Sequence, residues 1–429
     1  MNQRSVSDFR LRLDMHIVSY QDRITRIMRI FSVLVSLITI VAIIIYHGFF
    51  ITESVKQLIQ GVIYGSLVFY IVKYFILMFY SLKRPQYIKE TAFEFILILL
   101  LIFHFFIVLV FPGGREALAN QRFNEYYILF IQFYFLVIVL LELSKTSVFF
   151  TRFNLSPPKL MLFSFLFLII IGTVLLLLPR MTTHGISFVD ALFTSTSASC
   201  VTGLSVLDIG KDFTFKGQVV ILILVQLGGM SILTFATFFT AFLSRTNTGL
   251  RYQHMVKDMM SANKVSDSFL LLKHIVVSSL IVEAVGTFLL YVYWKGSGTF
   301  AQEGETFFYA IFHAVSAFNN AGFSLWNSNF MNQMVVHSYI PQTIIMIMVF
   351  LGGIGFVTLS DCFSPKMVRE RKKYKWKKLL PGTTIVLQTT FLIILVGTVI
   401  FFFTEYNHSL QSETTLFGKI FSSIFQIVS

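Results

Sequence analysis

The stretches SFVDALFTSTSASCVTGLSV (187–206) and ETFFYAIFHAVSAFNNAGFSL (305–325) follow one pattern. Each begins with an apolar segment of about 12 residues, at 188–199 and 305–317, which is too short to cross a bilayer because a spanning helix needs about 20. Each segment ends in a turn that contains a glycine. This pattern predicts a helix that enters the membrane and turns back. Irregular backbone at membrane depth is tolerated only where protein surrounds it or it lines a wet cavity, so the sequence predicts a pore.

Longer apolar segments surround both stretches and give the order span, short helix, turn, span. The chain has 429 residues, 55% of them hydrophobic and 13% charged, against roughly 25% charged in soluble proteins. The predicted fold class is an all-α membrane protein. Repeated units of outer helix, pore helix and inner helix follow four extra transmembrane helices.

About nine spans are expected, at residues 30–47, 58–80, 92–112, 127–143, 160–179, 217–243, 274–294, 340–360 and 383–403. They give five predicted regions: a four-helix region (1–155), a first pore repeat (156–245), a second pore repeat (270–362), a basic cytoplasmic linker (363–382) and the start of a third repeat (383–429). Pro157 and Pro158 mark the first boundary, because consecutive prolines cannot continue a helix.

The two turns contain residues suited to a cation filter. A filter replaces the hydration shell of the ion with backbone carbonyls, and glycine adopts the backbone angles that such a turn requires. The short helix would point its negative C-terminal end at the ion. The predicted filter residues are Cys200, Val201, Thr202, Gly203, Asn319, Asn320, Ala321 and Gly322, with Thr196, Ser197 and Ser316 as supports from the short helices.

A second matched pair, QLGGMSILTF (226–235) and FLGGIGFVTL (350–359), lies in the spans that follow the turns. Small residues let membrane helices pack closely, and we expect this packing to occur beside the pore, where glycines also allow the backbone to bend. The predicted inner-helix glycines are Gly228, Gly229, Gly352, Gly353 and Gly355.

The net charge of +13 predicts orientation and not a nucleic-acid partner. Most Lys and Arg residues lie in alternate loops, most densely in 366–378. The positive-inside rule places these loops and the N-terminus in the cytoplasm. The first 29 residues are largely polar and charged, so no cleavable signal peptide is expected. The predicted location is the inner (plasma) membrane of a bacterium, crossed several times.

Other chemistry has little support. The sequence contains no HExxH, CxxC, GxSxG or P-loop lysine motif, so neither an enzyme nor a bound cofactor is expected, and no metal beyond the transported ion. Cys200 and Cys362 are not expected to form a disulfide. Glu283 lies in the middle of a span, where ionisable groups are functional candidates. We expect it to pair within the helix bundle or pack near the pore mouth, more than to coordinate the ion.

Several stretches in order resemble one family. LPRMTTHGISFVDALFTSTSASCVTGL (178–204) and FHAVSAFNNAGFSL (312–325) are similar to the first two pore loops of the Trk/Ktr/HKT superfamily of potassium transporters, and WKKLLPGTTIVLQTT (376–390) resembles the start of its third repeat. The resemblance covers residues 155–429. It implies a potassium-channel-like fold of four covalently joined repeats with one filter glycine each, two of them Gly203 and Gly322. A serine at the first of these positions accompanies sodium preference in the family, so Gly203 favours K+.

The same resemblance implies partners. These are the lipid bilayer, a second copy of the pore subunit in a homodimer, and a cytosolic nucleotide-binding regulatory subunit of the RCK/KTN type. The sequence reaches only the third short helix of the four-repeat pattern, so we expect a fragment of a longer protein or a truncated, inactive product. A non-conducting membrane scaffold or sensor remains an alternative, as does a sodium-permeable or cation-symporting member of the family.

Overall fold

The computed structural model describes residues 3–81, 91–92, 95–96, 98–99, 157–230, 265–298, 300, 303–326, 338–374, 376, 378–412 and 415–429. The elements in these ranges are helices, and four are long and apolar enough to span a membrane, or five if one bent pair counts as a span. The all-α membrane fold is therefore confirmed. Span 127–143 and most of 92–112 lie outside the described residues, as does the end of 217–243.

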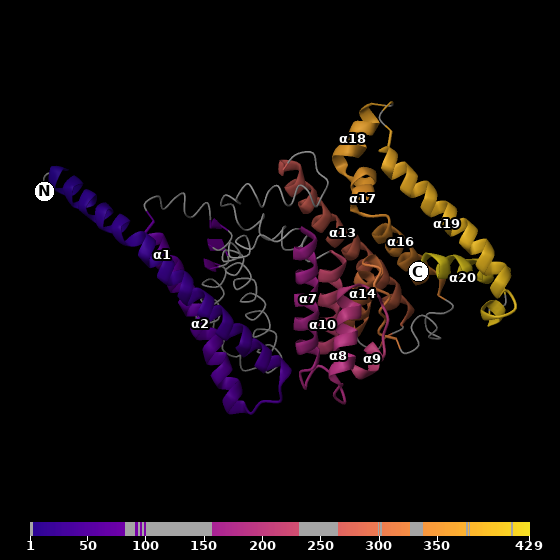
Figure 1. The fold of residues 1–429 in the computed structure, drawn as a ribbon, viewed down its shortest axis with the longest axis horizontal. Coiled ribbons are helices and arrows are strands. Elements are labelled where there is room, and N and C mark those ends of the chain that lie inside the picture. Colours follow the sequence, from indigo (N-terminus) through magenta and orange to yellow (C-terminus); the bar gives the residue numbers. More distant parts are fainter. Residues whose placement is uncertain are drawn as a thin grey trace. The chain divides into compact units, whose positions relative to one another are not determined.

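The chain divides into two compact units, Met1–Asn154 with Thr240–Thr248, and Leu155–Phe239 with Gly249–Ser429. In the first unit, α1 (Gln3–Gly48) and α2 (Glu53–Phe79) pack against each other (Figure 1). Buried hydroxyls join them, since Thr39 Oγ1 lies 2.8 Å from Ser66 Oγ and Tyr70 Oη donates to the Ser32 carbonyl over 3.0 Å. These bonds satisfy polar groups that lipid could not satisfy.

The second unit opens with two successive sets of helices. The first set is α7 (Pro157–Leu176), α8 (Phe188–Ser199), the short α9 (Ile209–Asp212) and α10 (Phe215–Gly229). The second set is α13 (Val265–Ser297), α14 (Glu303–Phe318), α16 (Tyr339–Gly353) and α17 (Phe356–Phe363). In Figure 1 these helices form the bundle in magenta to orange.

The short helix α8 begins at a side-chain cap and is too short to cross a bilayer. Ser187 accepts a hydrogen bond from the Asp190 backbone N–H and donates one to the Asp190 carboxylate over 2.7 Å, an N-terminal cap. With 12 residues, α8 is only about 18 Å long. It is therefore too short to span the roughly 30 Å hydrocarbon core.

The span predicted at 340–360 is broken in the structure into two helices. α16 ends at Gly353, and α17 leaves it at an angle of 107°. The break contains Gly355, whose φ of +81° and ψ of 151° lie in a region that is essentially restricted to glycine. The sequence indicated that glycines here could allow a bend, and the break shows how sharp it is.

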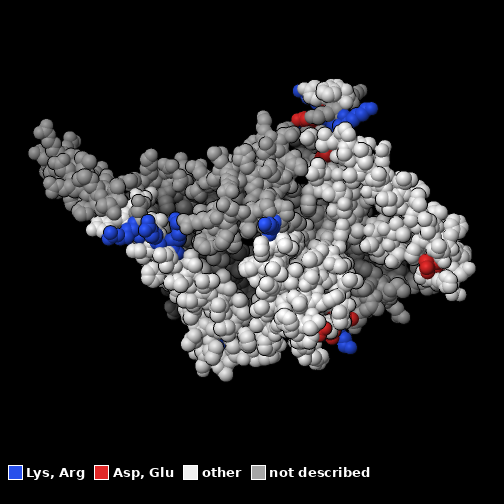
Figure 2. Space-filling model, viewed as in Figure 1, with Lys and Arg blue, Asp and Glu red and all other residues white. Residues whose placement is uncertain are grey.

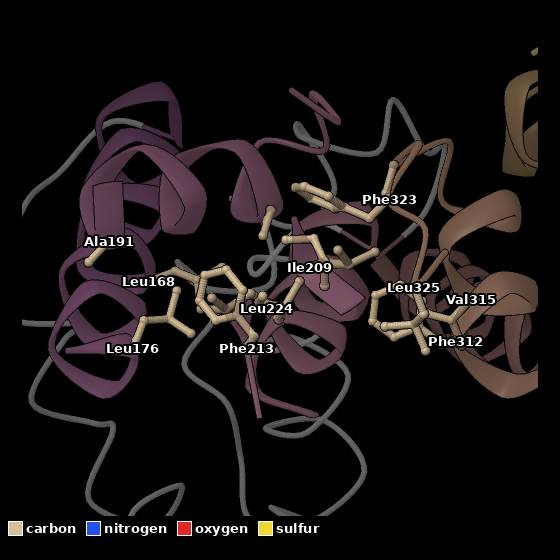
Figure 3. Close-up of a cluster of buried hydrophobic side chains, with 14 residues drawn as sticks. Leu168, Leu176, Ala191, Ile209, Phe213, Leu224, Phe312, Val315, Phe323 and Leu325 are labelled. Atoms are coloured by element: carbon tan, nitrogen blue, oxygen red, sulfur yellow. The ribbon is translucent and has the colours of Figure 1, made fainter. Parts of the chain in front are cut away.

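One buried cluster joins the two helix sets of the second unit (Figure 3). Leu176, Phe213 and Leu224 come from the first set, whereas Phe312 and Phe323 come from the second. Ala198 and Ala321, beside the two turns, belong to the same cluster. The turns therefore sit on one continuous core and not on two separate ones.

The remaining helices are α18 (Pro365–Lys373), α19 (Pro381–Glu405) and α20 (Leu416–Val428), with a short 3-10 helix at Ser409–Ser412. α20 packs on both α19 and α16, and Phe421 meets the ring of Tyr339 with centroids 4.9 Å apart. In Figure 2, Lys and Arg gather over α18, while the long flank of the neighbouring helices is mostly uncharged. Exposed Phe and Leu side chains on α7, α13 and α19 give that flank the character of a lipid-facing surface.

Candidate functional site

The candidate site consists of two turns, the first turn at residues 200–203 after α8 and the second turn at residues 319–322 after α14. Their backbones match position by position. Val201 and Asn320 both have φ of +57°, and Gly203 and Gly322 have φ of +77° and +73°. A positive φ at a valine is rare and persists only where surrounding structure enforces it. The matching positive φ values indicate that the surrounding structure enforces the same unusual backbone in both turns.

The same backbone hydrogen bonds close both turns. The Thr202 N–H donates to the Ser197 carbonyl over 2.8 Å, and the Ala321 N–H donates to the Ser316 carbonyl over 2.8 Å. The N–H groups of Cys200 and Asn319 likewise bond one helical turn back. These bonds occupy N–H groups of both turns, and the carbonyls of residues 200–203 and 319–322 accept none of them.

The two turns lie directly against each other. A Cβ atom added to Gly203 would overlap the Ala321 carbonyl oxygen, and one added to Gly322 would come 3.7 Å from the Gly203 Cα. Only glycine combines the positive φ with so close a backbone approach. Gly203 therefore has two independent reasons to be glycine, and Gly322 has chiefly its φ.

Side chains of α14 and of the second turn brace that turn on several sides. Ser316 Oγ donates to the Phe323 carbonyl over 2.8 Å. His313 is fully buried, bonds the Tyr309 carbonyl through Nδ1, and lies 3.1 Å from Ser324 Oγ through Nε2. With its amide oriented to satisfy every partner, Asn320 donates to the Val349 and Ala317 carbonyls and accepts from the Gly353 N–H. The second turn is thus tied to α14 and to α16.

The first turn has fewer such braces among the described residues. The Thr196 hydroxyl donates to the Leu192 carbonyl, one turn back on its own helix. The hydroxyls of Thr194, Ser197 and Ser199 are buried and have no hydrogen-bond partner among the residues that the structure describes. Ser197, which occupies the position of Ser316, therefore supports the turn through its backbone carbonyl and not through its side chain.

The paired glycines of α10 and α16 serve close packing against the short helices. A Cβ on Gly228 would overlap the Ser199 carbonyl, and a Cβ on Gly352 would overlap the Phe318 carbonyl. In both sets the first glycine thus meets the last residue of the short helix. Gly229 makes room for the Asn319 side chain, and Gly353 lies near Asn320. Gly355 has open space around it and instead forms the bend.

Glu283 on α13 lies beside the second turn, 5% exposed. Gln226 Nε2 and Asn319 Nδ2 donate to its Oε1 over 3.0 and 3.3 Å. The sequence predicts Glu283 as a bundle residue, but it does not single out Gln226 or His313 as functional. The available signal for Gln226 is a polar side chain in an apolar run, directly before Leu-Gly-Gly.

The site offers oxygen ligands but no cluster of metal-binding side chains. No group of three or more His, Cys, Asp or Glu residues that could hold a metal occurs in the described part of the chain. Cys200 and Cys362 are free thiols. The arrangement is chemically suited to weak ligation of a desolvated monovalent cation by carbonyl oxygens, helped by the C-terminal ends of α8 and α14.

Comparison with known proteins shows the family of the chain. The sequence model of the TrkH family, described as cation transport protein, matches residues 130–429. The chain is 35% identical over 284 residues to the Ktr system potassium uptake protein B of Bacillus subtilis, covering 64% of this chain and 59% of that protein. It is 34% identical over 273 residues to the protein of the same name in Vibrio alginolyticus, covering 63% and 57%.

The potassium/sodium uptake protein NtpJ of Enterococcus hirae is 28% identical over 280 residues, covering 65% of this chain and 59% of that protein. The chain thus spans less than two thirds of the length of the curated relatives that it matches. These relatives form a family of membrane transporters and not of enzymes. The family match covers well over half of the sequence and includes both turns. The chain therefore belongs to the TrkH family of cation transport proteins, within the Trk/Ktr superfamily.

Proposed function

We propose that the two turns form two of the four parts of a potassium-selective filter. K+ moves through this filter down its electrochemical gradient, without ATP hydrolysis. The observation that carries this proposal is the matched backbone of the two turns, with positive φ at Val201, Gly203, Asn320 and Gly322. Residues of alternating backbone handedness point successive carbonyls toward one side of the chain. Carbonyls arranged in this way can replace the hydration shell of a cation.

Potassium is the favoured ion because position 203 is a glycine. In the superfamily, a serine at this position accompanies a preference for sodium. Two relatives are named as potassium uptake proteins, and NtpJ as a potassium/sodium uptake protein. A sodium-permeable pore is thus the competing outcome. We further propose pore repeats at 156–245 and 270–362, a cytoplasmic linker at 363–382 and the start of a third repeat at 383–429.

The basic α18 supports a cytoplasmic location for the linker, and with it a cytoplasmic N-terminus in a bacterial inner membrane. The proposed partners are a second copy of the pore subunit and a cytosolic nucleotide-binding subunit on the linker side. The relatives' names describe them as lettered components of a system, which favours a separate regulatory component. Co-purification of the complete protein with such a subunit would test this pairing.

Growth at low K+ tests the proposed function. The complete protein, expressed in a bacterial host that lacks its own potassium uptake, is expected to restore growth. Gly203→Ser, whose Cβ would overlap the Ala321 carbonyl, and Gly322→Asp should both abolish growth at low K+ at an unchanged membrane level. No rescue by the complete protein would favour a non-conducting scaffold. Rescue that both substitutions leave intact would remove the turns from the filter.

A further inference from the structure

The buried carboxylate of Glu283 lies beside the second turn, within hydrogen-bond distance of Asn319. Glu283 lies in the part of α13 that is long and apolar enough to span the membrane, Ile275–Ser297, and its side chain is 5% exposed. An ionised or neutral carboxyl group at this depth is costly unless other groups satisfy it. The presence of Glu283 in a mostly apolar stretch therefore needs an explanation beyond packing.

Three donors converge on one oxygen of this carboxylate. Gln226 Nε2 of α10 donates to Glu283 Oε1 over 3.0 Å, Asn319 Nδ2 over 3.3 Å and Ser279 Oγ over 3.4 Å. Asn319 Nδ2 also reaches Gln226 Oε1 over 3.2 Å. The network therefore joins the outer helix of the second set, the inner helix of the first set and the second turn.

Asn319 is the link between this network and the turn. Its amide also donates to the Val315 carbonyl over 2.9 Å, so the side chain is fixed at its own helix as well. Gly229 gives it space, because a Cβ there would overlap the amide. Asn319 directly precedes Asn320, Ala321 and Gly322, so a shift of its side chain is transmitted to the carbonyls of the turn.

We propose that Glu283 and Gln226 are positioning residues that fix the second turn through Asn319 and thereby set discrimination between K+ and Na+. This inference rests on the proposed function. A filter that is free to contract accommodates the smaller ion better, whereas a turn held on two sides keeps its carbonyls at the spacing set by the fold. Cys200 occupies the position of Asn319 in the first turn, and its thiol is at most a weak donor. The second turn is therefore the rigid member of the pair.

Ion selectivity separates positioning from general stability. The complete protein is reconstituted in liposomes, and K+ and Na+ fluxes are measured per protein molecule. Glu283→Leu should lower the K+/Na+ flux ratio by about tenfold, because Asn319 loses its acceptor and the second turn is then free to contract around the smaller ion. Glu283→Gln retains an acceptor oxygen and should lower it less. Thr287→Val, one turn further along α13, should leave the ratio unchanged. Equal loss of both fluxes in Glu283→Leu would overturn the proposal.

An exchange of side chains tests the network itself. Asn319→Asp places a second carboxylate beside Glu283 and should impair both the ratio and the melting temperature. Adding Glu283→Gln restores one carboxylate facing amides, so the double variant should recover both properties. Defects that simply add would contradict the inference. If the wild-type protein carries no K+, the proposed function fails. The melting temperatures of the wild type, Asn319→Asp, Glu283→Gln and the double variant still decide whether the network exists.

Discussion

At the scale of single residues, Gly203 is the one glycine in the described part of the chain that combines a positive φ with an overlap against backbone. Its φ of +77° disfavours any side chain, and a Cβ would also meet the Ala321 carbonyl. Gly185 has the same φ of +77°, but a Cβ added there would meet nothing within 4 Å. Gly322 has φ of +73° and only an ordinary contact, with the Gly203 Cα. The three glycines thus separate the effect of backbone angle from the effect of close approach.

We expect Gly203→Ala to abolish K+ uptake, because the left-handed conformation costs about 1–2 kcal/mol and the overlap with Ala321 adds to it. Gly185→Ala should cost only the conformational term and leave uptake intact. Gly322→Ala should fall between them. Uptake per molecule in the membrane, measured for the three variants, checks this order. Equal effects of Gly203→Ala and Gly185→Ala would show that the approach of the two turns is unimportant.

Ser197 and Ser316 occupy the same position in the two sets but differ in their hydroxyls. Ser316→Ala should lower the free energy of unfolding by about 1–3 kcal/mol, because it leaves the buried Phe323 carbonyl without its donor. Ser197→Ala removes a hydroxyl that has no partner and should be neutral or slightly stabilising. Thermal melting in detergent compares them. A larger loss for Ser197→Ala would contradict the assignment of the brace to the second turn alone.

At the scale of elements, the inner helices are placed by contact with the ends of the short helices. Gly228 of α10 meets the Ser199 carbonyl, and Gly352 of α16 meets the Phe318 carbonyl. These contacts fix how closely each inner helix approaches its turn. The Leu-Gly-Gly pattern in the sequence predicts close helix packing, but the atoms that each glycine meets could not be inferred from the sequence.

Gly228→Ala should lower stability by about 1–3 kcal/mol, the usual cost of overpacking a core, because the new methyl group faces rigid backbone. Gly296→Ala, near the end of α13 with nothing within 4 Å, is the matched control and should be neutral or slightly stabilising. The melting temperatures of the purified variants provide the measurement. A harmless Gly228→Ala would mean that α10 is free to move away from α8.

At the scale of the whole second unit, a buried ion pair connects the second helix set with the basic linker and α19. Asp361 Oδ1 accepts from Arg371 over 3.0 Å, and its Oδ2 accepts from the Leu380 N–H over 2.9 Å. Arg371 also donates to the Asp361 and Cys362 carbonyls. Asp361 is 5% exposed, so these bonds are largely shielded from water. One carboxylate thus orients α18 and the start of α19 together.

Asp361→Ala should release the linker, because Arg371 and the Leu380 N–H lose their acceptor at a cost of about 1–3 kcal/mol. Faster trypsin cleavage within residues 366–378 is the expected result. Lys372→Ala, which removes one positive charge from the same helix, should not accelerate cleavage elsewhere in the linker. Unchanged cleavage kinetics in Asp361→Ala would show that other contacts hold the linker in place.

Local patterns predicted much of this arrangement. The short helix expected at 188–199 has those bounds, because Ser187 caps its start and a turn with positive φ ends it. The glycines near 355 indicated a possible bend, but its position and angle could not be predicted, because hydropathy stays high across 340–360 and only the conformation of Gly355 interrupts the helix. The network of Gln226, Glu283 and Asn319 could not be predicted, because its members come close only after three helices have packed.

The most direct test of the central claim is to locate Rb+, a heavier substitute for K+, in an experimental structure of the complete protein. We predict anomalous density for Rb+ beside the carbonyls of residues 201–203 and 320–322, and its loss in Gly203→Ser. Density elsewhere in the second unit, with none at the two turns, would contradict their assignment as the filter.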